Sequence, residues 1–194
     1  MSTLLRQIGI KFFLTEESDS SLDRFIPIFH EWIREKRIPD TLLIDVADYR
    51  HVPNGPGIIL VANEAHYAID STGGESGLLY SRLRDQARPA KEALADAIKR
   101  AAFAANALQN DSRLAEILSF RTDTLEMHVS DRLIAPNSAE TRASVEPVFR
   151  SVLEEFGYQG GDVVLAQDSR SRFALRLCGA SKSPPLAGLC FVTE

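Results

Sequence analysis

The segment from residue 42 to residue 84 most constrains the fold of this chain, because it holds four short strand-like runs in close succession. The runs lie at 42–47, 57–63, 65–71 and 77–84, and turn residues separate them. Short apolar or alternating runs that are divided by such turns are typical of hairpin-connected strands. The sequence therefore predicts an antiparallel meander in this part of the chain.

Helical patterns flank the meander on both sides. The apolar side chains of residues 22–33 recur at helical spacing, with Pro27 either in a first turn or at a bend. Residues 89–109 are rich in alanine and other strong helix formers, and residues 139–156 predict a further long helix. A shorter helix is expected around residues 113–120.

Further strands are expected at 9–14, 124–133, 162–167 and 172–179. The second of these alternates, so Glu126 and His128 are predicted to face solvent from a half-buried strand. The combined pattern indicates an α+β protein with a mostly antiparallel sheet and helices packed on it to cover its apolar face.

The two ends of the chain resemble each other. Residues 25–36 align without a gap on residues 145–156, so that Pro27 meets Pro147 and Phe29 meets Phe149. This similarity predicts an internal duplication of a strand-helix-strand-strand unit. The alternative is two similar units without a shared origin, because amphipathic helices resemble one another through periodicity alone.

The duplication divides the chain into a first α+β half (1–88), a helical connector (89–121) and a second α+β half (122–194). At 194 residues the three parts are expected to form one compact domain. The two halves then share one continuous sheet or form two packed lobes.

Composition and charge exclude several classes of protein. The chain is 44% apolar and 25% charged, with a formal net charge of −5, which is typical of a globular protein. An acidic chain lacks the basic footprint of a nucleic-acid-binding protein. No apolar run approaches the roughly 18 to 20 residues of a membrane span. We expect neither nucleic acid nor membrane as a partner.

The chain start and the cysteines favour a cytoplasmic location. Residues 1–17 show no uninterrupted apolar stretch or small-residue cleavage site of a signal peptide. Cys178 and Cys190 both lie in apolar surroundings, and we expect them to be reduced and buried.

One stretch gathers polar residues that could carry chemistry. The candidate catalytic residues are Asp45, Asp48, His51, Glu64, His66 and Asp70. Strand alternation places His66 and Asp70 on one face, and a carboxylate beside a histidine suits metal binding or general-base chemistry. His51, His66 and Asp70 are the predicted metal ligands. No fixed metal or catalytic motif is present, so the alternative to a functional site is a set of solvated polar side chains without a catalytic role.

A second feature concerns arginines and one loop. Arg170, Arg172 and Arg176 share one face of the last predicted strand, opposite its apolar residues. They either line a solvated sheet face or bind an anion or an acidic partner, because the forked donors of arginine suit carboxylates and phosphates. The loop 48–57 is the other predicted contact surface, and its residues 51–57 have no counterpart in the second half.

Two functional hypotheses follow from these features. The first is a binding or assembly protein that contacts another protein, or a second copy of itself, through loop 48–57 and the sheet-face arginines. The second is a small metal-dependent or acid/base hydrolase or lyase that uses the cluster of residues 45–70. The absence of a catalytic motif favours the first, and the sequence predicts no particular cofactor.

Overall fold

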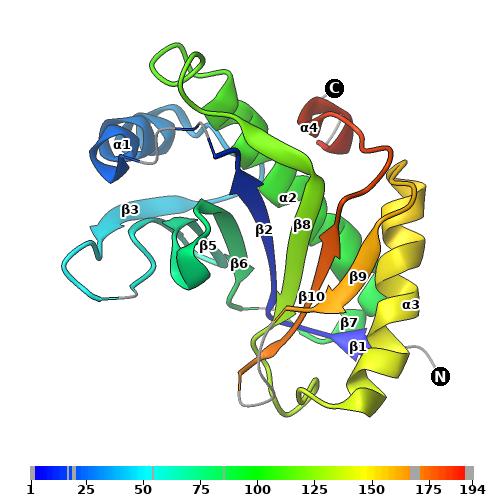
Figure 1. The fold of residues 1–194 in the computed structure, drawn as a ribbon. Helices are drawn as coiled ribbons and strands as arrows, with labels where there is room; N and C mark the ends of the chain where they lie inside the picture. Colours follow the sequence, from blue (N-terminus) through cyan, green and yellow to red (C-terminus); the bar gives the residue numbers. More distant parts are fainter. Residues whose placement is uncertain are drawn as a thin grey trace.

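One eight-stranded antiparallel sheet organises the protein. We analysed a computed structural model of the chain, which describes residues 3–16, 18, 21–53, 55–84, 86–166 and 171–190. The strand order across the sheet is β3-β4-β5-β6-β2-β8-β10-β9, and each pair is antiparallel (Figure 1). The predicted α+β class is confirmed.

The strands of this sheet are β2 (Ile8–Leu14), β3 (Leu43–Asp48), β4 (Ile58–Ala62), β5 (Ala65–Asp70), β6 (Gly77–Arg82), β8 (Phe120–Val129), β9 (Asp162–Leu165) and β10 (Phe173–Cys178). The α-helices are α1 (Phe25–Glu35), α2 (Ala90–Gln109), α3 (Ala139–Glu155) and α4 (Leu186–Leu189). Two short 3-10 turns, η1 (Leu22–Arg24) and η2 (Thr72–Gly74), and a small pair of strands, β1 (Leu4–Leu5) and β7 (Arg88–Pro89), complete the fold.

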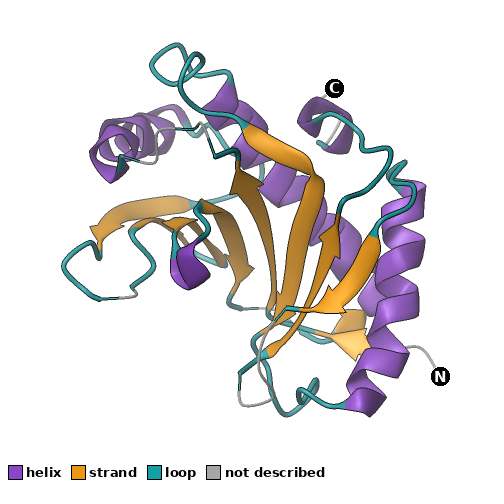
Figure 2. Cartoon of the chain, viewed as in Figure 1, coloured by secondary structure: helices purple, strands orange, loops and turns teal. Residues whose placement is uncertain are grey.

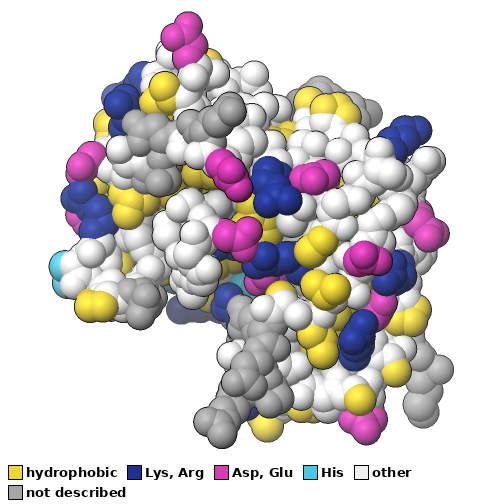
Figure 3. Space-filling model, viewed as in Figure 1, with side chains coloured by type: hydrophobic (Ala, Val, Ile, Leu, Met, Phe, Trp, Pro, Cys, Tyr) yellow, Lys and Arg dark blue, Asp and Glu magenta, His cyan; other side chains and the backbone are white. Residues whose placement is uncertain are grey.

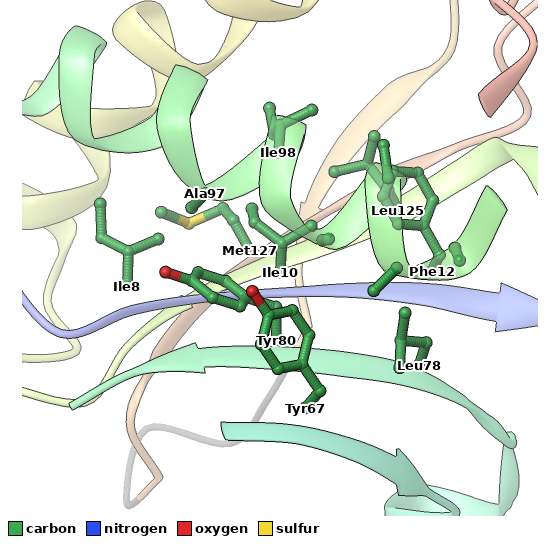
Figure 4. Close-up of a cluster of buried hydrophobic side chains, with 14 of the residues drawn as sticks. Ile8, Ile10, Phe12, Tyr67, Leu78, Tyr80, Ala97, Ile98, Leu125 and Met127 are labelled. Carbon is green, nitrogen blue, oxygen red and sulfur yellow. The ribbon is translucent and has the colours of Figure 1, made fainter. Parts of the chain in front are cut away.

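The α-helices cover one face of the sheet, and among the described residues the opposite face carries the short 3-10 turn η2 but no α-helix (Figure 2). Helix α2 lies behind the central strands β2 and β8, α1 lies on the β3 side, and α3 lies beside β9 (Figures 1 and 2). The core forms between α2 and the strands, where Ile10, Leu78 and Met127 pack against Ala97 and Ile98 (Figure 4). The alanines of α2 are small, so this helix can approach the sheet closely.

Two local predictions were wrong for identifiable reasons. Residues 112–117 form turns instead of a helix, and backbone hydrogen bonds from Leu114 to Asp111 and from Ile117 to Leu114 span three residues, as in successive turns. Strand β8 is buried on both faces, because it lies in the middle of the sheet between β2 and β10. Glu126 and His128, expected in solvent, are only 5% and 1% exposed.

Other sequence expectations are resolved more simply. Helix α1 begins at Phe25, so Pro27 lies in its first turn, where a missing backbone N–H costs nothing. The two cysteines are free, although each is partly exposed instead of buried. Within the described part of the chain, none of the helices has the length and apolar character that crossing a membrane requires. The internal duplication stays a prediction.

Candidate ligand site on the helix-free face of the sheet

Charged side chains from distant parts of the chain meet on the face of the sheet opposite the α-helices, which we call the helix-free face. Lys11 of β2 is the cross-strand partner of Glu126 of β8, and Glu126 is the partner of Arg176 of β10. The flanking residues of each strand, such as Ile10 and Phe12, belong to the core under the helices. Strand alternation therefore turns all three charged side chains to the helix-free face.

Two networks of ion pairs hold these charges in place. The Lys11 Nζ atom lies 2.6 Å from Oδ2 of Asp70, and each side chain is only 6% exposed. The Thr72 hydroxyl donates to the other oxygen of Asp70 at 2.5 Å. Because both charges of this pair are withdrawn from water, each depends on the other for its solvation.

The second network centres on Arg176, whose guanidinium bridges two carboxylates. Its Nη2 atom lies 2.9 Å from Glu126 Oε2, and its Nη1 atom lies 2.5 Å from Glu75 Oε2. The guanidinium carbon also lies 4.4 Å from the centroid of the buried Phe13 ring, in a cation–π arrangement. These contacts fix the orientation of Arg176 on the sheet.

A pocket of about 590 Å³ opens over these networks, toward β9 and the start of β10. We call it the sheet-face pocket; its charged lining residues are Lys11, Asp70, Glu75, Glu126, Arg172 and Arg176. Figure 3 shows basic and acidic side chains gathered near the centre of this face. Three cations and three carboxylates line the pocket, so its formal charge is balanced.

Arg172 differs from the other charged groups of the pocket. Its side chain is half-buried, yet within the described residues it makes no hydrogen bond and no ion pair. Burial lowers the pKa of Arg172, and the carboxylates of Glu126 and Asp70 oppose that decrease. A guanidinium stays charged in proteins and carries five N–H donors.

A buried histidine lies on the same face as the pocket. His128 is the cross-strand partner of Gly9, and its ring occupies the space that a Cβ atom on Gly9 would take. Neither ring nitrogen has a hydrogen-bond partner among the described residues. Burial holds the pKa of His128 well below its usual value, and the nearby charges of Arg172 and Lys11 lower it further. His128 is therefore neutral at physiological pH.

Of the six candidate catalytic residues, Asp70 alone lines the sheet-face pocket. His66 shares the face of Asp70, as predicted from strand alternation, and partial burial lowers its pKa. Asp45 lies in the same cross-strand row as His66 but is separated from it by Val61 of β4. Two strand spacings correspond to about 10 Å, so Asp45 and His66 are not in contact.

The remaining candidates have partners elsewhere. Asp48 accepts from the Arg50 side chain at 2.9 Å, and these hydrogen bonds lower the pKa of Asp48 to about 2. His51 is exposed and stacks on Tyr49, with ring centroids 6.3 Å apart. Glu64 lies at the far end of β5 from Asp70 and pairs with Arg82 at 2.7 Å.

The structure does not bring the predicted metal ligands together. Across the residues it describes, no three histidine, cysteine, aspartate or glutamate side chains are grouped so that they could hold a metal ion. His51, His66 and Asp70 lie on the loop after β3, near the start of β5 and at the end of β5.

The predicted contact surfaces lie in two different places. Arg172 and Arg176 line the sheet-face pocket, whereas Arg170 lies outside the described residues. Loop 48–57, described except for Asn54, is a turn in which the Tyr49 N–H donates to the Gly57 carbonyl at 2.8 Å. Its residues are not part of the sheet-face pocket.

Sequence reasoning missed Lys11, Glu126 and His128 as site residues. Lys11 is the single charged residue in the otherwise apolar strand β2, and that isolation was the available signal. Glu126 and His128 were noted as the polar face of a strand, but they were expected in solvent. The sequence matches no protein-family model and no curated protein.

Proposed function

We propose that this protein is a binding protein whose sheet-face pocket holds a ligand through a carboxylate group. The observation that carries the proposal is Arg172, a half-buried guanidinium without a hydrogen bond or ion pair among the described residues. Burial of such a charge is costly unless it is paired, and a planar carboxylate matches the fork of guanidinium donors. A bound carboxylate would supply the missing partner.

The volume and charge of the pocket define the ligand further. A volume of about 590 Å³ falls within the range of roughly 300 to 1,000 Å³ that is typical of small-molecule sites. Because the lining charges balance, the pocket offers no general attraction to polyanions. It suits a molecule with one carboxylate for Arg172 and with donor groups, such as an amine or hydroxyl, for Glu75 and the other acceptors.

The binding function is favoured over the hydrolase or lyase alternative. Asp70 is the one member of the candidate catalytic cluster in the pocket, and both of its oxygens already have partners. Acid/base catalysis needs its groups placed together around the proton that is transferred, and the other five candidate residues lie outside this pocket. The carboxylate that binds Arg172 could belong to a small molecule, to an acidic side chain of a protein partner, or to an acidic side chain of a second copy of the chain.

We also propose the cytoplasm as the site of action. Both cysteines are free thiols, and free thiols are typical of proteins in reducing compartments.

The proposal is tested by carboxylate binding to the wild type and to Arg172→Gln. Glutamate, succinate and an acidic peptide would each be titrated by calorimetry at fixed ionic strength. Loss of a charge-assisted hydrogen bond costs roughly 1.5 to 3 kcal/mol, which corresponds to about 10- to 150-fold weaker binding. A preference for the peptide over the free acids would identify a protein partner as the source of the carboxylate.

The matched control is Arg150→Gln. Arg150 lies on α3 away from the pocket and pairs with Glu146 at 2.9 Å, so its replacement removes the same charge from another surface. Binding should be unchanged in this variant. Equal weakening in both variants, or no saturable binding to the wild type by any of the three probes, would refute the proposed function.

A further inference from the structure

A second cavity lies on the opposite side of the sheet, at the edge of the core under the helices. It has a volume of about 170 Å³ and is lined by the segment that joins α1 to β3, the turn between β4 and β5, and side chains of β5, β6 and α2. We call it the tyrosine cavity, because Tyr67 and Tyr80 form part of its wall together with Thr41, Arg82 and Arg100.

The two tyrosines bring uncompensated polar atoms to this cavity. Tyr67 and Tyr80 are cross-strand partners on β5 and β6, both side chains are fully buried, and their ring centroids are 5.2 Å apart. Figure 4 shows the two hydroxyl oxygens at the same end of the pair. Among the described residues neither hydroxyl has a partner at full hydrogen-bonding geometry, although Thr41 and Arg100 act on the Tyr67 hydroxyl and Arg82 acts on that of Tyr80. Buried polar groups in native proteins are normally satisfied, so these two hydroxyls indicate a missing partner.

Basic side chains surround the same space. Arg100 of α2 donates to Asp96 at 3.0 Å and to the Thr41 hydroxyl at 3.3 Å, and Arg82 of β6 pairs with Glu64. These contacts hold both guanidiniums at the cavity wall. Asp40 and Glu64 also line the cavity, so it combines two guanidiniums, two carboxylates and the hydroxyl donors, and its formal charge is balanced.

The phenols are suited to donate hydrogen bonds. Burial raises the pKa of Tyr67 and of Tyr80, although Arg82 and Arg100 partly oppose this rise. Both phenols consequently keep their protons at physiological pH. With guanidiniums near the phenol oxygens, the O–H groups are left to point at an acceptor inside the cavity.

We propose that the tyrosine cavity binds a small oxyanion, through hydrogen bonds from Tyr67 and Tyr80. An oxyanion supplies several acceptor lone pairs and a negative charge, which complement the hydroxyl donors and the two arginines. A cavity of about 150 Å³ accommodates benzene, so the tyrosine cavity has room for a carboxylate or phosphate of about five to seven non-hydrogen atoms. The site is separate from the sheet-face pocket and does not rest on the function proposed for that pocket.

The test measures stabilisation by simple oxyanions. Thermal unfolding of the full chain would be followed in acetate, phosphate and chloride at equal ionic strength. A ligand that binds the folded state alone raises the unfolding temperature in a saturable way. We expect saturation in acetate or phosphate but not in chloride, together with chemical-shift changes for carbon-labelled rings of Tyr67 and Tyr80.

Two tyrosine variants and one control complete the design. Tyr67→Phe and Tyr80→Phe each remove one donor while keeping the packed ring, and each should weaken oxyanion binding at least tenfold. Tyr158→Phe is the matched control, because the Tyr158 hydroxyl is also buried, has no hydrogen-bond partner in the described part of the chain and lies outside the cavity. It should bind the oxyanion as the wild type does.

Several results would overturn the proposal. An identical response of the wild type in all three salts would show that no oxyanion binds. An equal loss in Tyr158→Phe would show that the effect does not arise in the cavity. Crystals soaked in acetate or phosphate that hold only ordered water between Tyr67 and Tyr80 would identify water as the missing partner.

Discussion

The buried ion pair between Lys11 and Asp70 allows a quantitative prediction. Lys11→Met keeps a long apolar side chain in strand β2 but removes the charge that lies 2.6 Å from Asp70. The Asp70 carboxylate, in a residue that is only 4% exposed, would then keep just the Thr72 hydroxyl as a close donor. Breaking a buried pair from one side costs about 3 to 5 kcal/mol, because an uncompensated charge stays buried.

The double variant separates the cost of the orphaned charge from the value of the pair. Replacing both partners by apolar residues of similar size is often neutral or stabilising, since no charge is left in the interior. We therefore expect Lys11→Met/Asp70→Leu to recover most of the stability that Lys11→Met loses. The coupling between the two substitutions should be at least about 2 kcal/mol, which is within the range for residues in contact.

Equilibrium urea unfolding measures these effects. A loss of about 3 to 5 kcal/mol is a large part of the roughly 5 to 15 kcal/mol that stabilises a domain, so the urea midpoint of Lys11→Met should fall clearly at an unchanged slope. Lys91→Met is the matched control, because Lys91 pairs with Glu155 at 2.5 Å on the surface, where both side chains are more than half exposed. Such a pair contributes about 0 to 1 kcal/mol.

Two outcomes would refute this reasoning. If Lys11→Met cost no more than the surface control, the pair would not be withdrawn from water. If the double variant lost as much as the sum of the two single variants, Lys11 and Asp70 would act independently.

Three further predictions concern other parts of the fold. Gly9→Ala should destabilise the protein by about 1 to 3 kcal/mol, as overpacking does, because the new Cβ overlaps the His128 ring. Adding His128→Ala removes that ring and should restore part of the lost stability, measured by urea titration. Ser138→Ala should cost about 1 kcal/mol, since the Ser138 hydroxyl accepts from the Thr141 N–H at 3.2 Å and caps α3; a change below about 0.3 kcal/mol would contradict this role. Hydrogen bonds from Arg113 lower the pKa of Asp111 in the folded protein. The stability that this ion pair adds is therefore fully present above the unfolded-state pKa of Asp111, about 4, and is lost as the pH falls through the lower folded-state pKa. Arg113→Gln should flatten the acid side of the stability–pH curve, and an unchanged curve would count against the pair.

Local pattern predicted most of the secondary structure. The four runs between residues 42 and 84 are strands β3 to β6, and the alanine-rich run is α2. These segments are predictable because turn residues bound each short apolar strand run, and because the alanine-rich run consists of strong helix formers. The predicted helix over residues 113–120 was wrong, because the segment closes into short turns with three-residue hydrogen bonds and then enters β8 at Phe120.

The candidate site was less predictable than the fold, because its residues meet only through strand order. Lys11 and Asp70 are 59 residues apart in the chain, and Arg176 and Glu126 are 50 residues apart. Alternation along β8 correctly grouped Glu126 with His128, but it could not show that the polar face would be buried. That burial depends on β2 and β10 lying on either side of β8, and periodicity within one strand contains no information about its neighbours.

The position of β2 in the sheet also has a consequence for biosynthesis. Strands β2 to β6 come from the first 82 residues and are neighbours in the sheet, whereas β8, the other neighbour of β2, ends at residue 129. Ribosomes add about 5 to 20 residues per second, so the intervening 47 residues take roughly two to nine seconds to synthesise. During that interval β2 is a temporary edge of the nascent sheet. A charged side chain on an edge strand discourages pairing with other chains, so Lys11 would protect the growing polypeptide before Glu126 has been made.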